Sequence, residues 1–130
     1  MALFDAQHRA MMDLINDLHG ALVVSADPEL TGKLFSELVA VTIHHFATEE
    51  ALFLEIHYPE AALHQAWHHK LRKELAVLAS DVGSGCRQVD EDLIDWLKGW
   101  FVDHVMDADR PFARAVQSAF PDSSISHSTH

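Results

Sequence analysis

Apolar residues recur at spacings of three and four through most of this 130-residue chain, which is the period of one face of a helix. The first such stretch begins at about Phe4 and ends at Val23 or Val24, and three more follow it. The alternating pattern of a β-strand is missing from the sequence, and so is an internal repeat. The pattern therefore predicts an all-α protein with four long helices.

The first breaks between these helices carry recognisable stop and start signals. Asp27 is suited to cap the second helix, and Pro28 to occupy its first position, where no N–H partner is needed. Tyr58 precedes Pro59 and is pushed out of the α region, so the second helix should end near His57. We expect the third helix to open at Pro59.

Glycine, acidic residues and proline mark the later boundaries. The Gly-Ser-Gly run at 83–85 should close the third helix, and the acidic run at 90–92 places negative charge near the positive end of the fourth. Pro111 should kink or end the fourth helix and leave a short terminal helix to about Phe120. Because the connections are short, the predicted fold is an up-down-up-down four-helix bundle with a short C-terminal helix.

Length and composition indicate a single domain. With 48% hydrophobic residues the chain can bury a core, which we assign to residues 1–120, and the Ser/His-rich segment 121–130 is expected to be disordered. The single Cys86 excludes an internal disulfide and agrees with a reducing compartment. No signal peptide or membrane span is visible, so we expect a cytoplasmic protein. A formal net charge of -11 argues against nucleic acid and anionic membranes as partners.

Ionisable residues lie inside the apolar stripes of the predicted helices. His45 and Glu49 interrupt the second stripe, and His64 and His68 interrupt the third. The members of each pair are four residues apart, so each pair points two donor groups from one helix face at a common spot. Such groups are costly to bury unless they are paired or coordinated. The pattern therefore favours a metal site in the core.

The full candidate set is larger than one ion needs. With His8, His104 and Asp109 it contains five imidazoles and two carboxylates but no thiolate, which suits two metal ions. His104 and Asp109 are five residues apart, so the helix there needs a distortion, for which Pro111 is a source. Iron fits this set best, since zinc prefers four ligands and manganese a more oxygen-rich site.

Other polar residues near these positions have simpler explanations. Glu50 lies about 100° round the helix from Glu49, so we expect it to support a ligand or to be exposed. The remaining histidines are interpreted as solvated, boundary or tail residues: His19, His44, His57, His69, His127 and His130.

The candidate residues occur within motifs that resemble those of the bacterial haemerythrin (bacteriohaemerythrin) family, in order and in register, over roughly residues 5–115. These motifs are Asp-Ala-Gln-His at 5–8, His-Phe-Ala-Thr-Glu-Glu at 45–50, Tyr-Pro-Glu at 58–60 followed by His64 and His68, and His104 through Asp109 and Arg110. The resemblance implies a non-haem di-iron centre in a four-helix bundle that binds O₂ reversibly.

The resemblance also implies a role for each candidate ligand. Glu49 and Asp109 would bridge the two iron ions together with an oxo or hydroxo group. One iron would be saturated by the three imidazoles of His64, His68 and His104. The other would be held by His8 and His45 and keep an open position for O₂.

Three residues fall where this family lines its oxygen pocket, namely Phe46, Trp100 and Met106, although the last position is more often leucine. The chain also departs from the family at its start, because only seven residues precede His8. That departure bears on how the end of the bundle near His8 is covered.

The predicted function is reversible O₂ binding for storage, carriage or delivery, not enzymatic catalysis. The mostly neutral, histidine-rich ligand set should favour the diferrous state, so that O₂ is released unchanged. Besides O₂, a recipient or signalling protein is a possible partner. The alternatives are an O₂- or redox-sensing module and a di-iron enzyme acting on peroxide, nitric oxide or iron. The enzyme ranks last because no acid–base group beyond the ligands is evident.

Overall fold

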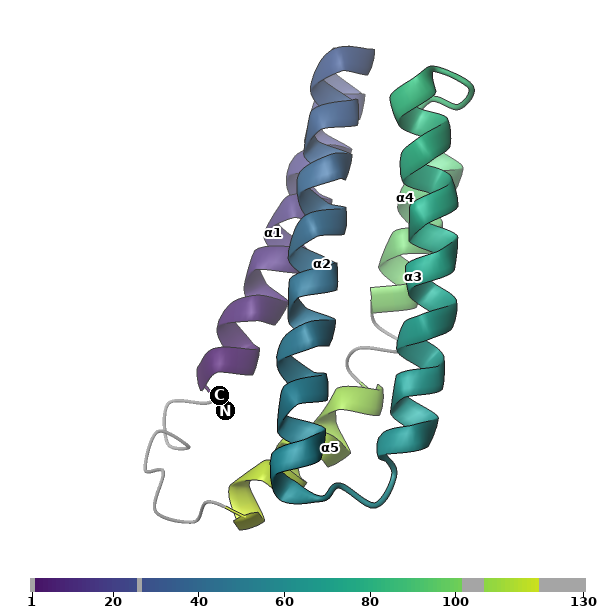
Figure 1. Ribbon diagram of the computed structural model, residues 1–130. Helices are drawn as coiled ribbons and strands as arrows, with labels where there is room; N and C mark the ends of the chain where they lie inside the picture. The colour runs from purple at the N-terminus through teal and green to yellow at the C-terminus, as the bar shows by residue number, and fades with distance from the viewer. Residues whose placement is uncertain (1, 26, 102–106, 120–130) are drawn as a thin grey trace.

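Five helices make up the described part of the protein, in an up-down-up-down bundle with a short C-terminal helix, as predicted (Figure 1). The computed structural model describes residues 2–25, 27–101 and 107–119, although the side chains of residues 2–5, 107–110 and 113 lie outside that description. The helices are α1 (Ala2–Val24), α2 (Pro28–Ile56), α3 (Ala61–Ser84), α4 (Glu91–Trp100) and α5 (Asp107–Ala119).

The helix boundaries follow from local capping. The side chain of Asp27 accepts a hydrogen bond from the N–H of Glu29 at 3.1 Å, and Pro28 occupies the first turn of α2, as predicted. α2 ends with His57 in the left-handed conformation at φ 54°, and α3 ends with Gly85 at φ 82°. At the start of α4, the side chain of Asp90 accepts from the N–H of Leu93 at 2.9 Å.

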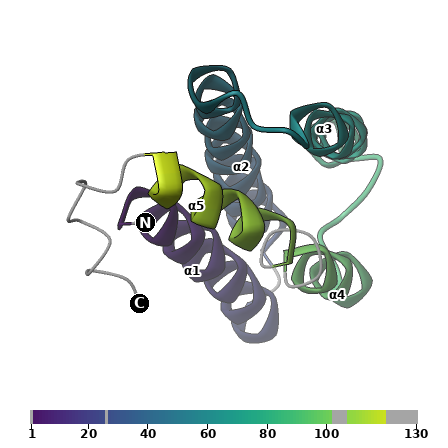
Figure 2. The same ribbon diagram turned by 90° about the horizontal axis from the view of Figure 1, so that it is seen from below.

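The core fills the centre of the bundle and is contributed by α1 to α4. Fully buried side chains include Ile15 of α1, Phe35 of α2, Leu75 of α3 and Ile94 of α4. Figure 2, which looks along the bundle from below, shows these four helices arranged around a common axis. This packing turns the apolar stripes inward, and it carries the ionisable residues in those stripes into the core.

A second, smaller cluster closes one end of the bundle. There α5 lies across the lower end next to α2 (Figures 1 and 2). Phe112 and Val116 of α5 pack with Phe53 of α2, and Tyr58 of the α2–α3 connection lies against them. The ring centroids of Phe53 and Phe112 are 4.6 Å apart, in an edge-to-face arrangement.

The prediction that Pro111 breaks the fourth helix was wrong in position. The described part of α4 ends at Trp100, and Pro111 lies inside α5, which begins at Asp107 and runs across the end of the bundle (Figure 2). Pro111 is tolerated because it is the fifth residue of α5. The first four N–H groups of a helix have no internal partner, so proline here removes only the bond to the carbonyl of the first residue.

Two sequence predictions about the periphery concern the membrane and the tail. Among the described helices, none is long and apolar enough to cross a membrane. The segment 121–130, for which disorder is predicted, lies outside the described residues.

Candidate metal centre

Three helices bring predicted ligands together inside the bundle, towards the end that α5 crosses. His45 and Glu49 of α2 have no solvent exposure, and His64 and His68 of α3 are 4% and 3% exposed. The half-buried His8 of α1 joins them, with its ring centroid 4.8 Å from that of His45. The burial of the four residues of α2 and α3 agrees with the inward direction that their apolar stripes predict.

Glu49 lies at the centre of the cluster, and its two carboxylate oxygens face different histidines. Oε2 is 3.6 Å from Nε2 of His45. Oε1 is 3.0 Å from Nε2 of His68 and 3.6 Å from Nε2 of His64. The carboxylate thus separates two groups of imidazoles, with His45 and its neighbour His8 on one side and His64 and His68 on the other.

The carboxylate of Glu49 is fully buried, yet neither oxygen accepts a hydrogen bond from the part of the chain that the structure describes. Leaving a buried carboxylate without a hydrogen-bond donor costs about 1–3 kcal/mol or more. The arrangement therefore fits a cation between the carboxylate and the imidazoles. Glu49, His64 and His68 already offer three ligand atoms that lie within 4.8 Å of one another.

The hydrogen bond between His68 and Glu50 determines which ring nitrogen of His68 carries the proton. Nδ1 of His68 lies 2.9 Å from Oε2 of Glu50 and donates to it, because an ionised carboxylate can only accept. In the neutral ring Nε2 then carries no proton, although it lies 3.0 Å from a Glu49 oxygen. Two lone pairs at this distance require a cation or a proton between them.

Arg72, one turn after His68, holds Glu50 in place. Its guanidinium donates to both oxygens of Glu50, at 2.8 and 2.9 Å. Partial burial of Glu50 opposes ionisation, but the hydrogen bonds from Arg72 and His68 and the charge of Arg72 outweigh it and lower the pKa of the carboxyl. Glu50 therefore supports a candidate ligand, which is one of the two roles that the sequence predicted for it.

A second hydrogen-bond chain fixes His45 in the same manner. The hydroxyl of Thr48 donates to the carbonyl of His44 at 3.0 Å, so it must accept from the Nε2 amide of Gln7 at 3.2 Å. The Oε1 of Gln7 is then left to accept from Nδ1 of His45 at 2.7 Å. Nε2 of His45 consequently presents a lone pair to Glu49, as does Nε2 of His68.

Aromatic rings cover the imidazoles. Phe46 stacks on His68 with ring centroids 4.1 Å apart, and it meets Trp100 edge-on at 6.1 Å. Phe53 lies 5.1 Å from His64 on the other side of the cluster. Of the predicted pocket residues, Phe46 therefore lies against a candidate ligand, and Trp100 lies against Phe46.

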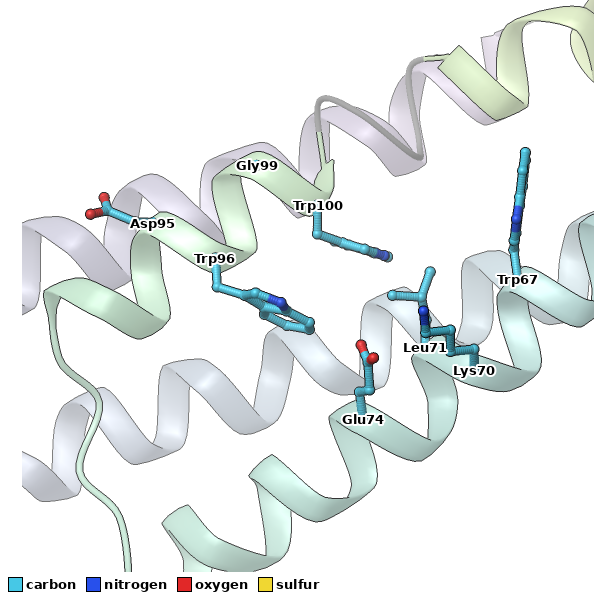
Figure 3. Close-up of a pocket in the computed structure, with 8 residues that line it drawn as sticks. All are labelled: Trp67, Lys70, Leu71, Glu74, Asp95, Trp96, Gly99 and Trp100. Atoms are coloured by element: carbon cyan, nitrogen blue, oxygen red, sulfur yellow. The ribbon is translucent and has the colours of Figure 1, made fainter.

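Trp100 also borders a separate pocket of about 420 Å³ between α3 and α4 (Figure 3). Its indole reaches from α4 towards Leu71 of α3, with Trp96 beside it and Trp67 at the edge of the pocket. None of the residues that line this pocket is a candidate ligand. Trp100 therefore lines this pocket and also contacts Phe46, the ring that stacks on His68.

Three of the predicted site residues cannot be placed in the cluster. His104 and Met106 lie outside the described residues. Asp109 belongs to α5, but its side chain is outside that description. Their roles as ligands and as a pocket residue stay predictions.

The supporting residues Gln7, Thr48 and Arg72 were not singled out from the sequence as hydrogen-bond partners. The partner of Arg72, Glu50, is 22 residues away, and of the bonds of Thr48 only the one to the carbonyl of His44 has a helical spacing. Gln7 has no partner at such a spacing, because its partners are 38 and 41 residues away.

The geometry defines a class: a four-helix bundle that carries a buried histidine–carboxylate metal site. Residues 1–116 match the family model described as "Hemerythrin HHE cation binding domain". The chain is 30% identical over 116 residues to the bacteriohemerythrin of Stenotrophomonas maltophilia, covering 89% of this chain and 74% of that protein. It is 29% identical over 114 residues to the bacteriohemerythrin of Methylococcus capsulatus, covering 88% and 86%.

Solved structures agree with these sequence matches. The crystal structure of wild-type hemerythrin superimposes with a TM-score of 0.83 at 26% identity, over 88% of both chains. The protein therefore belongs to the haemerythrin family.

Proposed function

We propose that this protein binds O₂ reversibly, for storage, carriage or delivery, at a non-haem di-iron centre. The observation that carries the proposal is the buried carboxylate of Glu49, which has no hydrogen-bond donor in the described part of the chain and has imidazole lone pairs facing both of its oxygens. Membership of a family whose model is described as cation binding supports the same conclusion.

The arrangement around Glu49 supports two metal positions. We assign His8 and His45 to the position on the Oε2 side, and His64, His68 and His104 to the position on the Oε1 side. Glu49 and Asp109 would bridge the two positions. When bound, a pair of iron ions would supply the redox-active centre at which O₂ binds, and His8 and His45 would hold the ion with fewer imidazoles.

The protein's own side chains then have two tasks. Gln7 and Glu50 orient His45 and His68 so that Nε2 of each ring points at the metal positions. Phe46, Trp100 and Met106 form the walls that exclude water and slow the proton entry that leads to irreversible oxidation. Of these walls, Phe46 and Trp100 are 2% and 5% exposed.

We infer a binding protein in place of an enzyme. In the described part of the site, the polar side chains near Glu49 are candidate ligands or their hydrogen-bond partners, which leaves no further group for acid–base catalysis. We place the protein in the cytoplasm, since its exposed Cys86 thiol fits a reducing compartment. We propose O₂ as its ligand; a carriage or delivery role would in addition require a protein that receives the O₂.

The test measures O₂ uptake and release by the anaerobically reduced, iron-loaded protein. We expect about two irons per chain and about one O₂ taken up per pair of irons, with most of it returned under argon. Glu49→Gln should lose iron and O₂ uptake, whereas Glu55→Gln, at an exposed position on the same helix, should keep both. Retention of iron and O₂ uptake by Glu49→Gln, or O₂ consumed without return, would contradict the proposal.

A further inference from the structure

The histidines on the two sides of Glu49 differ in the group that accepts a hydrogen bond from Nδ1. Nδ1 of His45 donates to the neutral amide oxygen of Gln7 at 2.7 Å. Nδ1 of His68 donates to the carboxylate of Glu50 at 2.9 Å. The two imidazoles therefore face the same central carboxylate, at 3.0 Å for His68 and 3.6 Å for His45, and their Nδ1 groups donate to acceptors of different charge.

The charged acceptor is also the more firmly held. Arg72 donates two hydrogen bonds to Glu50. The guanidinium carbon of Arg72 lies 5.5 Å from the ring centroid of Phe46. Phe46 in turn stacks on His68 at 4.1 Å and an interplanar angle of 16°. His68, Glu50, Arg72 and Phe46 thus form a closed ring of contacts that fixes the His68 imidazole in position.

An anionic acceptor draws the Nδ1 proton towards itself and leaves more electron density on Nε2 than a neutral amide does. The imidazole of His68 is accordingly a stronger donor to a metal ion than that of His45. A metal ion beside His68 would therefore be bound more tightly, and its more highly charged state would be stabilised more. The position beside His45 is correspondingly the more labile of the two.

We propose that Glu50 and Gln7 are positioning residues that give the two metal positions unequal donor strength. The inference rests on the proposed function for the presence of two metal ions. The inference goes beyond the proposed function because it assigns the unequal donor strength to hydrogen bonds outside the ligand set, and not only to the number of histidines on each side.

The hydrogen-bond part of the inference can be tested without any metal. In metal-free protein with ¹⁵N-labelled histidine, in mildly alkaline buffer, long-range ¹H–¹⁵N correlations should show the proton of both His45 and His68 on Nδ1. Glu50→Ala should move the proton of His68 to Nε2 and leave His45 unchanged. Glu91→Ala is the control, because that carboxylate contacts a histidine of α1 at 3.4 Å, away from the site. An unchanged His68 tautomer in Glu50→Ala would overturn the assigned role of Glu50.

The donor-strength part is tested by titration with cobalt(II), which takes the same nitrogen and oxygen ligands as ferrous iron and is stable in air. The two stepwise dissociation constants are measured, and histidine resonances show which position fills first. The near-isosteric exchanges Glu50→Gln and Gln7→Glu act on opposite sides. Each should reduce the ratio of the dissociation constant beside His45 to that beside His68 by about 10-fold or more. This is the size of effect that outer hydrogen-bond partners have on metal affinity.

The order of filling in the wild type does not decide the inference, because unequal numbers of histidines also favour one side. The change in the ratio decides it. Two bound cobalt ions with an unchanged ratio in both exchanges would overturn this inference alone. Fewer than two bound ions in the wild type would overturn the proposed di-metal site and this inference with it. An equal change of the ratio in Glu91→Gln would show a general charge effect and also overturn it.

Discussion

Replacing Glu49 by glutamine should stabilise the metal-free protein and destabilise the metal-bound one. In the wild type a buried carboxylate faces the unprotonated Nε2 of His68 at 3.0 Å, with no described donor for either oxygen. An amide of the same shape carries no charge, and its NH₂ group can donate to that nitrogen. The substitution thus replaces a repulsive contact by a hydrogen bond.

The size of the effect follows from the cost of a buried polar group that lacks a partner. Mutational data put this cost at about 1–3 kcal/mol, so the metal-free variant should gain roughly that amount. At about 4 °C per kcal/mol for a domain of this size, its Tm should rise by roughly 4–12 °C. A metal ion at 1,000 times its dissociation constant stabilises the wild type by about 4 kcal/mol, a gain that the variant forgoes.

The assay is thermal and urea unfolding of both proteins, with a chelator and with ferrous iron or cobalt(II). The order of stability should reverse between the two conditions, and Glu55→Gln should behave as the wild type in both. A Glu49→Gln variant that is less stable than the wild type in the chelator would refute the reasoning. That result would mean that Glu49 already has a partner in the metal-free protein, such as a protonated imidazole.

Four further predictions concern single positions. His57→Gly should stabilise the protein by about 0.5–1 kcal/mol in urea unfolding, because His57 caps α2 at a positive φ of 54°; a loss of stability would contradict this. Asp90→Ala should cost about 1 kcal/mol in the same assay through loss of the cap of α4, and no change would show that the cap is dispensable. The pKa of Glu50 is lowered in the folded state, so its ionised carboxylate stabilises the fold above about pH 4.5, and this stabilisation is lost as the pH falls through the folded-state pKa. Glu50→Gln should therefore lose stability less steeply in acid, and an unchanged slope would contradict this. Trp100→Gln should speed conversion of the reduced, iron-loaded protein to an oxidised form that no longer binds O₂, followed optically, with the iron content unchanged; an unchanged rate would remove Trp100 from the protective wall.

The fold could be predicted from the sequence because its signals are local. The apolar period of α1 to α4, the cap of α2 at Asp27 and the glycine end of α3 each depend on residues a few positions apart. The position of the turn into α5 was predicted wrongly. Pro111 is a strong local signal for a helix break, yet it lies inside α5, whose Phe112 and Val116 pack on Phe53.

The candidate site could be predicted in part for the same reason. His45, Glu49, His64 and His68 are found by spacing, since one helix face carries each pair. The hydrogen bond between Gln7 and His45 joins two helices across 38 residues, so it needs the tertiary structure. The bond between Glu50 and His68 across 18 residues needs it as well. The sequence therefore predicts the candidate ligands but not the contacts that orient them.

The optical spectrum of one sample, taken through repeated cycles of air and argon after anaerobic reduction, tests the central claim most directly. With about two irons per chain, a charge-transfer band should form in air and disappear under argon over several cycles. A band that persists under argon after the first cycle, or a protein that carries a single zinc ion, would contradict reversible O₂ binding at a di-iron centre.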